Sequence, residues 1–421
     1  GTNVSGLQSE LGVHFTPTST DFKTFMFYLS KINLNQNINL DNATDAYNML
    51  EIANSIIDNN NSNVITGTQP GQVAMAQEND TSYDRNKVQL INNGTITLSG
   101  ANSTAMYAKF GELKNNATGT ITVGDSSAAL YGTNDSKIEN INGGVINLGN
   151  GSTGIYSEGD TAAGITNSSG TFKGSVNNDG IIASTGKSIG ITYKGTGAGN
   201  TDTRVTNDTN GKINLAGEGS VGIYGLGSNY KILNNGEINL SGTKVTGVYN
   251  QGTFTMENGA TGTASVTTSG EGSISLYAKG ETGNPSTTNI NSGKIVAKDK
   301  EDINAKAIGA YVKGANAKFE NKGKISAENI ALALQGTGAN KILNSGTLNL
   351  TKTGAVGVYA KDSVVDFNIA PTVASGIDKT VALYASGTTK IKSQITSASG
   401  KAHIGVYAED DAEFLSGSKV T

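Results

Sequence analysis

The sequence predicts an all-β protein: a right-handed parallel β-helix of about twelve three-strand coils, preceded by a small helical N-terminal module. Three observations favour this fold. A short apolar motif returns about every 25 residues from Asn93 onward, and a second motif ending in Tyr follows it at a steady offset. Gly is abundant, at 56 residues, whereas Pro is rare, at 4. Repeats of this length are typical of stacked units that bury their apolar faces against their neighbours.

The first strand of each predicted coil carries the pattern Gly-x-Ile-x-Leu, as in residues 94–98 and 144–148. Apolar residues two places apart point to one face of a strand, so this pair is expected to face the core. We expect right-handed winding, which parallel crossover connections strongly prefer. The twelve predicted anchors are Ile96, Ile121, Ile146, Ile182, Ile213, Ile238, Ala264, Ile295, Ile325, Leu348, Val373 and Ile395.

The second strand carries a small residue, an aliphatic residue and a Tyr; Thr192 and Ala333 stand in the Tyr position of two coils. Neighbouring residues of a strand face opposite ways, so we expect the aliphatic residue in the core and the Tyr outside. We interpret the Tyr column as an offset-stacked ladder that stiffens the coils. A platform for sugar rings or partner aromatics, and a bent strand that buries the rings, are the alternatives. The column contains Tyr107, Tyr131, Tyr156, Tyr224, Tyr249 and Tyr277, and continues with Tyr311, Tyr359, Tyr384 and Tyr407.

The third strand ends in an apolar residue followed two places later by Asn, and often by Gly two places after that. Because Asn and Gly tolerate positive φ, this pattern predicts a sharp corner before the next coil. Stacked Asn amides are expected to hydrogen-bond along the coil axis.

Residues 1–85 lack the period, and we assign them either to a mostly helical cap that covers the open end of the β-helix at residues 86–421 or to an adjoining small module. Two segments show helical spacing, and Asp41 or Asn42 is a plausible N-cap for the second. Alternating residues between them predict a strand. No matching lid follows at the C-terminus, so we expect a C-terminally truncated piece. The helical positions are Phe22, Phe25, Met26 and Leu29, then Ala46, Met49, Leu50, Ala53 and Ile57; the strand positions are Ile32, Leu34, Ile38 and Leu40.

The charge of the chain and its content of Arg, Cys and His limit the classes of function that we expect. The net charge of −4 argues against a nucleic-acid partner. Because Arg85 and Arg204 are the only arginines, a bidentate clamp for a phosphate or carboxylate anion is not expected either. With no Cys and only His14 and His403, the chain offers little material for a nucleophile–His system or a zinc site, so we expect no catalytic residues, metal or cofactor. The acidic runs at 299–302 and 409–411 are expected to be solvated turns; clustered carboxylates of a polysaccharide-cleaving enzyme are the alternative.

The path after the Tyr strand lengthens at residues 157–174, 194–203 and 279–288, and all three insertions leave the same corner. A fourth, at residues 298–306, leaves another corner. Loops on a rigid scaffold often carry recognition, although loop lengthening also costs little and is tolerated as drift. The candidate binding residues on this loop ridge are Asp160, Thr161, Thr196, Asn200, Asp202, Glu281 and Asn284.

The combination of Asn-x-Gly-x-Ile-x-Leu with Gly-Ile/Val-Tyr in a cysteine-free chain resembles the passenger domains of bacterial (type V) autotransporters, most of all the large fusobacterial outer-membrane adhesins. The resemblance covers residues 86–421. It implies a secreted passenger that is tethered in the full-length protein to an outer-membrane barrel. Such a passenger is displayed on the cell surface and has a role in virulence. We therefore expect a monomeric adhesin or adhesin stalk that binds a host-cell or bacterial surface protein or glycan through loops on one side of a rigid rod. A toxin subunit that oligomerises or touches membranes is the alternative implied by the family.

Overall fold

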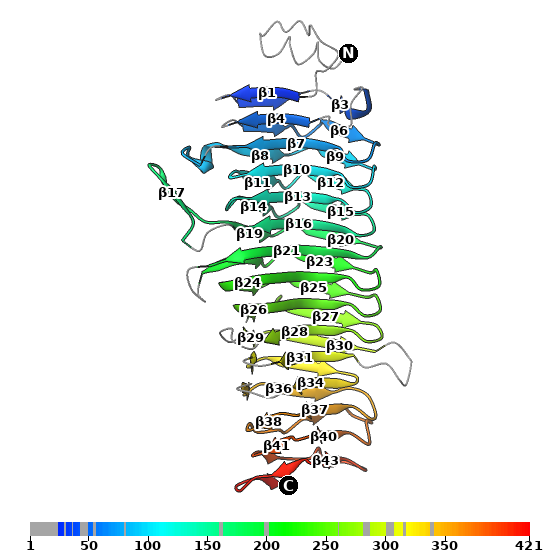
Figure 1. Ribbon diagram of the computed structural model, residues 1–421. Coiled ribbons are helices and arrows are strands. Elements are labelled where there is room, and N and C mark those ends of the chain that lie inside the picture. The colour runs from blue at the N-terminus through cyan, green and yellow to red at the C-terminus, as the bar shows by residue number, and fades with distance from the viewer. Residues whose placement is uncertain are drawn as a thin grey trace, which may run out of the picture. The chain divides into compact units, whose positions relative to one another are not determined.

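Three short strands and three corners make up each repeat, and successive repeats lie in register (Figure 1). The computed structural model describes residues 24–28, 31–35, 37–42, 49–53, 56–79, 81–159, 163–197, 202–259, 261–280, 287–299, 307–314, 317–336 and 341–421. The chain divides into two compact units. Unit 1 contains Gly1–Ala198 and Arg204–Leu215, and unit 2 contains Gly199–Thr203 and Ala216–Thr421. Each unit is a parallel β-solenoid, and together they comprise about 13 turns.

The first strands of the repeats pair in parallel, with their apolar residues inward. In β9, β12 and β15 every second side chain is buried, and Ile96, Ile121 and Ile146 are direct partners in the register. This confirms the predicted column of aliphatic anchors. In unit 1 these strands are β3 (Ile38–Asn39), β6 (Val64–Gly67), β9 (Thr95–Leu98), β12 (Thr120–Val123), β15 (Val145–Leu148), β20 (Ile181–Ser184) and β23 (Lys212–Leu215); in unit 2 they are β25 (Glu237–Leu240), β27 (Ser265–Ser269), β30 (Lys294–Lys298), β33 (Lys324–Ala327), β36 (Thr347–Leu350) and β39 (Thr372–Val373).

Three of the anchors are displaced from the predicted register. Ile395 forms a parallel bridge with Ile369 and not with Val373. Val266, not Ala264, pairs with both Ile238 and Ile295, because the corner before β27 is longer than in other coils. Val373 pairs with Leu350 and not with Leu348.

The second strands are longer and bury two residues in succession. In β10 the burial runs through Ala105 and Met106 before Tyr107, which is only half-buried. In unit 1 these strands are β1 (Thr24–Tyr28), β4 (Met49–Ala53), β7 (Val73–Glu78), β10 (Thr104–Lys109), β13 (Ala128–Thr133), β16 (Ser152–Glu158) and β21 (Ser188–Thr196); in unit 2 they are β24 (Val221–Asn234), β26 (Thr246–Asn258), β28 (Ile274–Gly280), β31 (Ile308–Gly314), β34 (Ile330–Gln335), β37 (Val356–Lys361), β40 (Val381–Ser386) and β43 (Ile404–Ala408).

Apart from β2, which ends on Leu34, the third strands of this column end on the predicted Asn, and β24 and β26 continue into the column without a break. The other members are β2 (Lys31–Leu34), β5 (Ile56–Asn59), β8 (Gln89–Asn92), β11 (Glu112–Asn115), β14 (Lys137–Asn140), β19 (Ser175–Asn178), β22 (Thr203–Asn207), β29 (Thr287–Asn291), β32 (Ala317–Asn321) and β35 (Lys341–Asn344). The last coils form small separate sheets: β38 (Val364–Val365) with β41 (Lys390–Ile391) and β44 (Glu413–Phe414), and β42 (Gln394–Ile395) with β45 (Lys419–Val420).

The Asn side chains form hydrogen-bonded ladders inside both units, as predicted. Each Asn Nδ2 donates to the Oδ1 of the Asn one coil further along the chain, at 2.7–2.9 Å. A buried amide needs such partners, and the ladder supplies them to all its inner members. The ladder of unit 1 contains Asn59, Asn92, Asn115, Asn140, Asn178 and Asn207; that of unit 2 contains Asn234, Asn258, Asn291, Asn321 and Asn344.

The Gly after each Asn is needed for space and not for positive φ, which corrects the predicted reason for the corner. Gly119 has no positive φ. A Cβ on Gly119 would lie 2.4 Å from the Asn92 carbonyl oxygen and 2.3 Å from Asn115 Oδ1. Only Gly lets the chain pass this close to the Asn ladder.

The prediction of a helical N-terminal cap is wrong for the described residues. The described residues contain no α-helix, only the 3₁₀ turns η1 (Leu40–Asn42) and η2 (Arg85–Lys87). Phe25 and Met26 lie in β1, whereas Met49, Leu50 and Ala53 lie in β4 and Ile57 lies in β5. These strands pair in parallel with the next coils, so the solenoid already runs through this segment. The single strand expected over Ile32 to Leu40 is instead two strands, β2 with Ile32 and Leu34 and β3 with Ile38, while Leu40 begins the turn η1. Phe22, Leu29 and Ala46 lie outside the described residues.

Candidate functional site

The predicted loop ridge falls largely outside the described residues. Thr196 ends β21 in unit 1, and Asp202 precedes β22 in unit 2; both side chains are half-buried. The other five positions, Asp160, Thr161, Asn200, Glu281 and Asn284, lie outside the described residues. The ridge as a common surface stays a prediction.

One of the insertions is described in most of its length and folds into a hairpin that stands out from the coils of unit 1 (Figure 1). β17 (Ile165–Asn167) and β18 (Gly170–Phe172) pair in antiparallel fashion. The Asn167 side chain holds the hairpin to a second excursion, because its Nδ2 donates to the carbonyl oxygens of Thr81 at 2.8 Å and Tyr83 at 2.7 Å. Two loops far apart in sequence thus order one another. We call residues 165–172 the hairpin arm.

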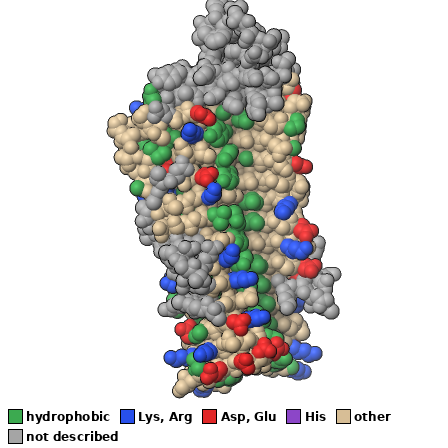
Figure 2. Space-filling model, viewed as in Figure 1, with side chains coloured by type: hydrophobic (Ala, Val, Ile, Leu, Met, Phe, Trp, Pro, Cys, Tyr) green, Lys and Arg blue, Asp and Glu red, His purple; other side chains and the backbone are tan. Residues whose placement is uncertain are grey.

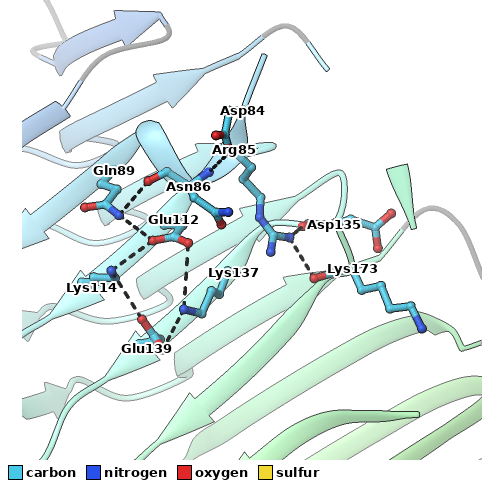
Figure 3. Close-up of polar contacts among 10 residues, drawn as sticks. All are labelled: Asp84, Arg85, Asn86, Gln89, Glu112, Lys114, Asp135, Lys137, Glu139 and Lys173. Carbon is cyan, nitrogen blue, oxygen red and sulfur yellow. Dashed lines mark hydrogen bonds and ion pairs between the residues drawn. The ribbon is translucent and has the colours of Figure 1, made fainter. Parts of the chain in front are cut away.

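Arg85 fixes the base of the hairpin arm (Figure 3). Its Nη1 donates to the carbonyl oxygen of Lys173 at 2.8 Å and to that of Asp135. The guanidinium carbon lies 5.3 Å from the centre of the Phe172 ring, within the range of a cation–π contact. Phe172 in turn meets Phe110 edge to face at 5.6 Å. Burial lowers the pKa of Arg85, and the nearby carboxylates of Glu112 and Asp135 oppose that shift.

Arg204 completes the anchor from the next coil. Arg204 and Asp135 are both fully buried and lie 3.6 Å apart between Nη1 and Oδ1. The same Nη1 donates to the Gly174 carbonyl oxygen at 3.0 Å, and the Gly174 amide donates to Asp135 Oδ1 at 3.0 Å. Both arginines of the chain therefore hold one insertion. In the sequence, the scarcity of Arg argues only against an anion clamp. The use of Arg at just two positions, in a chain whose other basic residues are Lys, was the available sign of a structural anchor.

Beside this anchor, four alternating charges form a flat network on β11 and β14 (Figure 3). Lys114 lies 3.0 Å from Glu112 and 3.8 Å from Glu139, while Lys137 lies 3.9 Å and 3.0 Å from the same two carboxylates. Gln89 Nε2 donates to Glu112 at 2.7 Å. Each carboxylate has two cations within reach, so the network balances its own charge and supports structure rather than acid–base chemistry.

The tyrosines lie on the outer face, as predicted, and form one ladder in unit 1, which is followed in register by Thr192, and two ladders in unit 2, which are separated by Ala333. Neighbouring ring centres are 4.8–5.5 Å apart. The expected offset stack is found only in part. Tyr224–Tyr249 and Tyr277–Tyr311 are stacked, whereas three pairs meet edge to face and two are tilted. Both geometries are favourable for aromatic rings. The ladders contain Tyr107, Tyr131 and Tyr156; Tyr224, Tyr249, Tyr277 and Tyr311; and Tyr359, Tyr384 and Tyr407.

The environment of several ladder phenols favours their protonated form. Burial raises the pKa of Tyr311 to about 12, with smaller contributions from Tyr277 and Tyr359. Hydrogen bonding to Glu409 is the main cause that raises the pKa of Tyr384 and of Tyr407. At neutral pH Tyr311, Tyr384 and Tyr407 therefore present neutral rings whose hydroxyls can donate.

Little in the described residues suggests catalysis. No group of three His, Asp or Glu side chains there could hold a metal ion. His403 is engaged through Nδ1 with the Thr380 hydroxyl at 2.8 Å, and His14 lies outside the described part. The acidic run at 409–411 lies in an exposed turn, as expected. Of the run at 299–302, only Asp299 is described, and its amide donates to Glu328 Oε2 at 2.8 Å.

Comparisons of the chain with protein-family models, curated protein sequences and solved structures find no match. Among the described residues, no helix is long and apolar enough to span a membrane.

Proposed function

We propose that the chain is a surface-displayed binding scaffold, the passenger segment of an autotransporter, which acts as a non-catalytic adhesin or adhesin stalk. In this proposal the passenger is exported through the outer membrane and acts as a monomer. Its partner is a protein or glycan on a host-cell or bacterial surface, bound non-covalently. The parallel β-solenoid is compatible with such a role, since stacked coils offer long surfaces on which loops are held in fixed positions.

The observation that best supports binding is the hairpin arm. Its base is held by buried Arg85 and Arg204, by an aromatic contact and by Asn167, so little ordering entropy remains to be lost when a partner binds. Its tip is exposed and rich in hydroxyl groups, which suit hydrogen bonding to a polar partner. The exposed tip residues are Thr166, Ser168, Ser169 and Thr171.

The test is binding of the full chain to bacterial and host epithelial cells, measured by flow cytometry. A variant with all four tip residues replaced by Ala keeps the anchor of the arm and removes its hydroxyls. We expect its cell binding to fall by roughly tenfold, the loss of about 1.4 kcal/mol. The matched control replaces four exposed hydroxyl residues elsewhere, Ser62, Thr353, Ser375 and Ser399, and should bind as the parent does.

Two results would count against this proposal. If the parent chain binds no cell type tested, the chain is not itself adhesive, and only the stalk role survives. If the tip variant and its control bind alike, the hairpin arm is not the adhesive element.

A further inference from the structure

A stripe of tyrosines and lysines runs along the outer face of the second strands in unit 2. The rings of Tyr249, Tyr277 and Tyr311 follow one another at 5.1 Å, each about half-buried on its own strand. Figure 2 shows hydrophobic side chains gathered into a narrow band on this face, with Lys side chains beside it. Contiguous exposed apolar bands commonly mark interaction sites.

Polar residues two places after each Tyr form a second column beside the rings. The strand register pairs Gln251 with Lys279, Lys279 with Lys313, Lys313 with Gln335, and Gln335 with Lys361. Lys313 and Lys361 are exposed. The hydroxyl of Tyr249 donates to Gln251 Oε1 at 2.7 Å, and that of Tyr311 donates to Gln335 Oε1. The latter contact fixes the Gln335 amide beside the rings with its NH₂ group as a donor.

The charge of this region is opposite to that of the whole chain. Residues 272–361 carry twelve Lys against six Asp and Glu, although the chain as a whole has a net charge of −4. No run of the sequence concentrates these lysines. Parallel in-register pairing brings together residues that lie 22 to 34 positions apart and thereby makes a basic column.

We propose that this Tyr–Lys stripe, Tyr249, Tyr277 and Tyr311 with Gln251, Lys279, Lys313, Gln335 and Lys361, binds a linear acidic glycan laid along the coil axis. This inference names a class of partner for the proposed adhesin. It rests on the proposed function only in placing the glycan on a cell surface.

Three features select this occupant. Aromatic faces suit the apolar CH face of a sugar ring, and the repeat of the ladder is close to the rise per sugar of an extended polysaccharide. Lysine ammonium groups act as point charges that pair with carboxylates or sulfates without demanding a fixed orientation. The band is one ring wide, which provides too little apolar area for insertion into a lipid surface.

The experiment measures binding of the full chain to immobilised hyaluronate, heparin and neutral dextran by biolayer interferometry. We expect binding to at least one acidic glycan, weakening with salt, and none to dextran. Hyaluronate binding would identify carboxylates as sufficient, whereas heparin binding alone would identify sulfates. Absence of binding to both acidic glycans, or equal binding to dextran, would overturn the proposal.

Two variants test the stripe itself. The variant Lys279→Gln/Lys313→Gln/Lys361→Gln should bind at least about tenfold more weakly. Its matched control, Lys294→Gln/Lys324→Gln/Lys352→Gln, makes the same change in charge on other faces and should bind within about twofold of the parent. Equal losses in both would show unspecific attraction and contradict the stripe.

The variant Tyr277→Thr/Tyr311→Ala places in the ladder the residues that occur naturally at Thr192 and Ala333, so the coil is expected to fold, as far-UV circular dichroism would verify. It should also lose at least about tenfold in affinity. Retained affinity would refute the aromatic part of the site. A single-stranded oligothymidylate serves as a competitor, since bases also stack on Tyr; tighter binding to it than to either glycan would overturn the proposal.

The two proposals fail separately. The hairpin-tip variant should keep its glycan affinity and lose cell binding. A chain that binds cells but no acidic glycan leaves the adhesin role standing without the stripe. A chain that binds acidic glycan through the stripe but binds no cells supports the stripe and contradicts the adhesin role.

Discussion

Asn140 illustrates how a single polar residue can be indispensable to an apolar core. Its side chain is fully buried, accepts from Asn115 Nδ2 at 2.9 Å and donates to Asn178 Oδ1 at 2.8 Å. Both neighbours depend on it in turn, because water cannot reach them. Linked buried hydrogen bonds of this kind polarise one another, and a missing member costs more than its own bond.

We therefore expect Asn140→Ala to lower the free energy of unfolding by about 2–4 kcal/mol, since it leaves a buried donor and a buried acceptor without their ladder partner. Urea unfolding followed by far-UV circular dichroism measures the change. Asn147→Ala is the control: Asn147 faces outward on the next strand, β15, and makes one long contact, 3.4 Å, with the Thr122 hydroxyl. If both variants lose equal stability, the ladder has no special role.

The buried pair of Arg204 and Asp135 supports a second prediction at this scale. Arg204→Met leaves the Asp135 carboxylate buried without its cation and should cost about 3–5 kcal/mol. Adding Asp135→Asn removes the uncompensated charge and should recover part of that loss. Thermal unfolding of the two single variants and the double variant gives the coupling energy. A double variant as unstable as the sum of both singles would show that the pair does not interact.

At the scale of elements, the strands that were predicted as helices have a physical explanation. Second-strand segments bury two residues in succession and leave the third half-buried, as β10 and β13 show. Two successive apolar residues, such as Phe25 and Met26 in β1, also occupy positions i+3 and i+4 on the apolar face of an amphipathic helix. Without a neighbouring Gly-x-Ile-x-Leu repeat, the apolar residues of β1 and β4 carried no signal that favoured a strand over a helix.

The first and third strands were predictable because their patterns are unambiguous. Alternation with a period of two residues predicts that Ile96 and Leu98 point inward. The Asn two places after the apolar residue of each third strand predicts the Asn ladder. The outward position of Tyr107 followed from its aliphatic neighbour Met106. The anchor of the hairpin arm was not predictable, because Arg85 meets Lys173 and Asp135 only through the stacking of coils.

The tyrosine ladder of unit 2 predicts a stability change at alkaline pH. Folding raises the pKa of Tyr311 from its ordinary 10.0 to about 12, so the folded state favours the neutral phenol. The resulting stabilisation is complete below pH 10 and is lost as the pH rises from 10 to about 12. We expect tyrosinate absorbance to show a phenol that ionises later than tyrosines of the chain unfolded in urea. Tyr311→Phe should lower the amplitude of that late phase by one phenol, while Tyr384, whose pKa is also raised, continues to ionise late. An unchanged amplitude would show that Tyr311 does not ionise late.

At the scale of the whole molecule, a solenoid is held together by contacts between adjacent coils, so its stability is close to a sum over coils and their interfaces. Because equivalent residues stack in parallel register, removal of one complete repeat brings equivalent strands of the two flanking repeats together. Each remaining strand then pairs with a strand of the same kind. Sequence periodicity predicts this modular property, whereas the corners at β27 and β39 show that coil lengths vary too much for exact boundaries to be read from it.

Deletion of one coil in unit 2 tests this additivity. Removing residues 324–346 deletes β33, β34 and β35, and it joins Gly323 to Thr347, which is paired with Lys324 in the register. β31 would then meet β37, and Tyr311 would meet Tyr359 once Ala333 is gone. We expect the shortened chain to keep its far-UV circular dichroism per residue and to unfold cooperatively in urea. Removing residues 324–335 alone places third-strand β35 directly after third-strand β32, so its anchors lose their columns and the unit should lose much of its strand signal. A half-coil deletion that folds as well as the full-coil deletion would show that register does not hold the coils together.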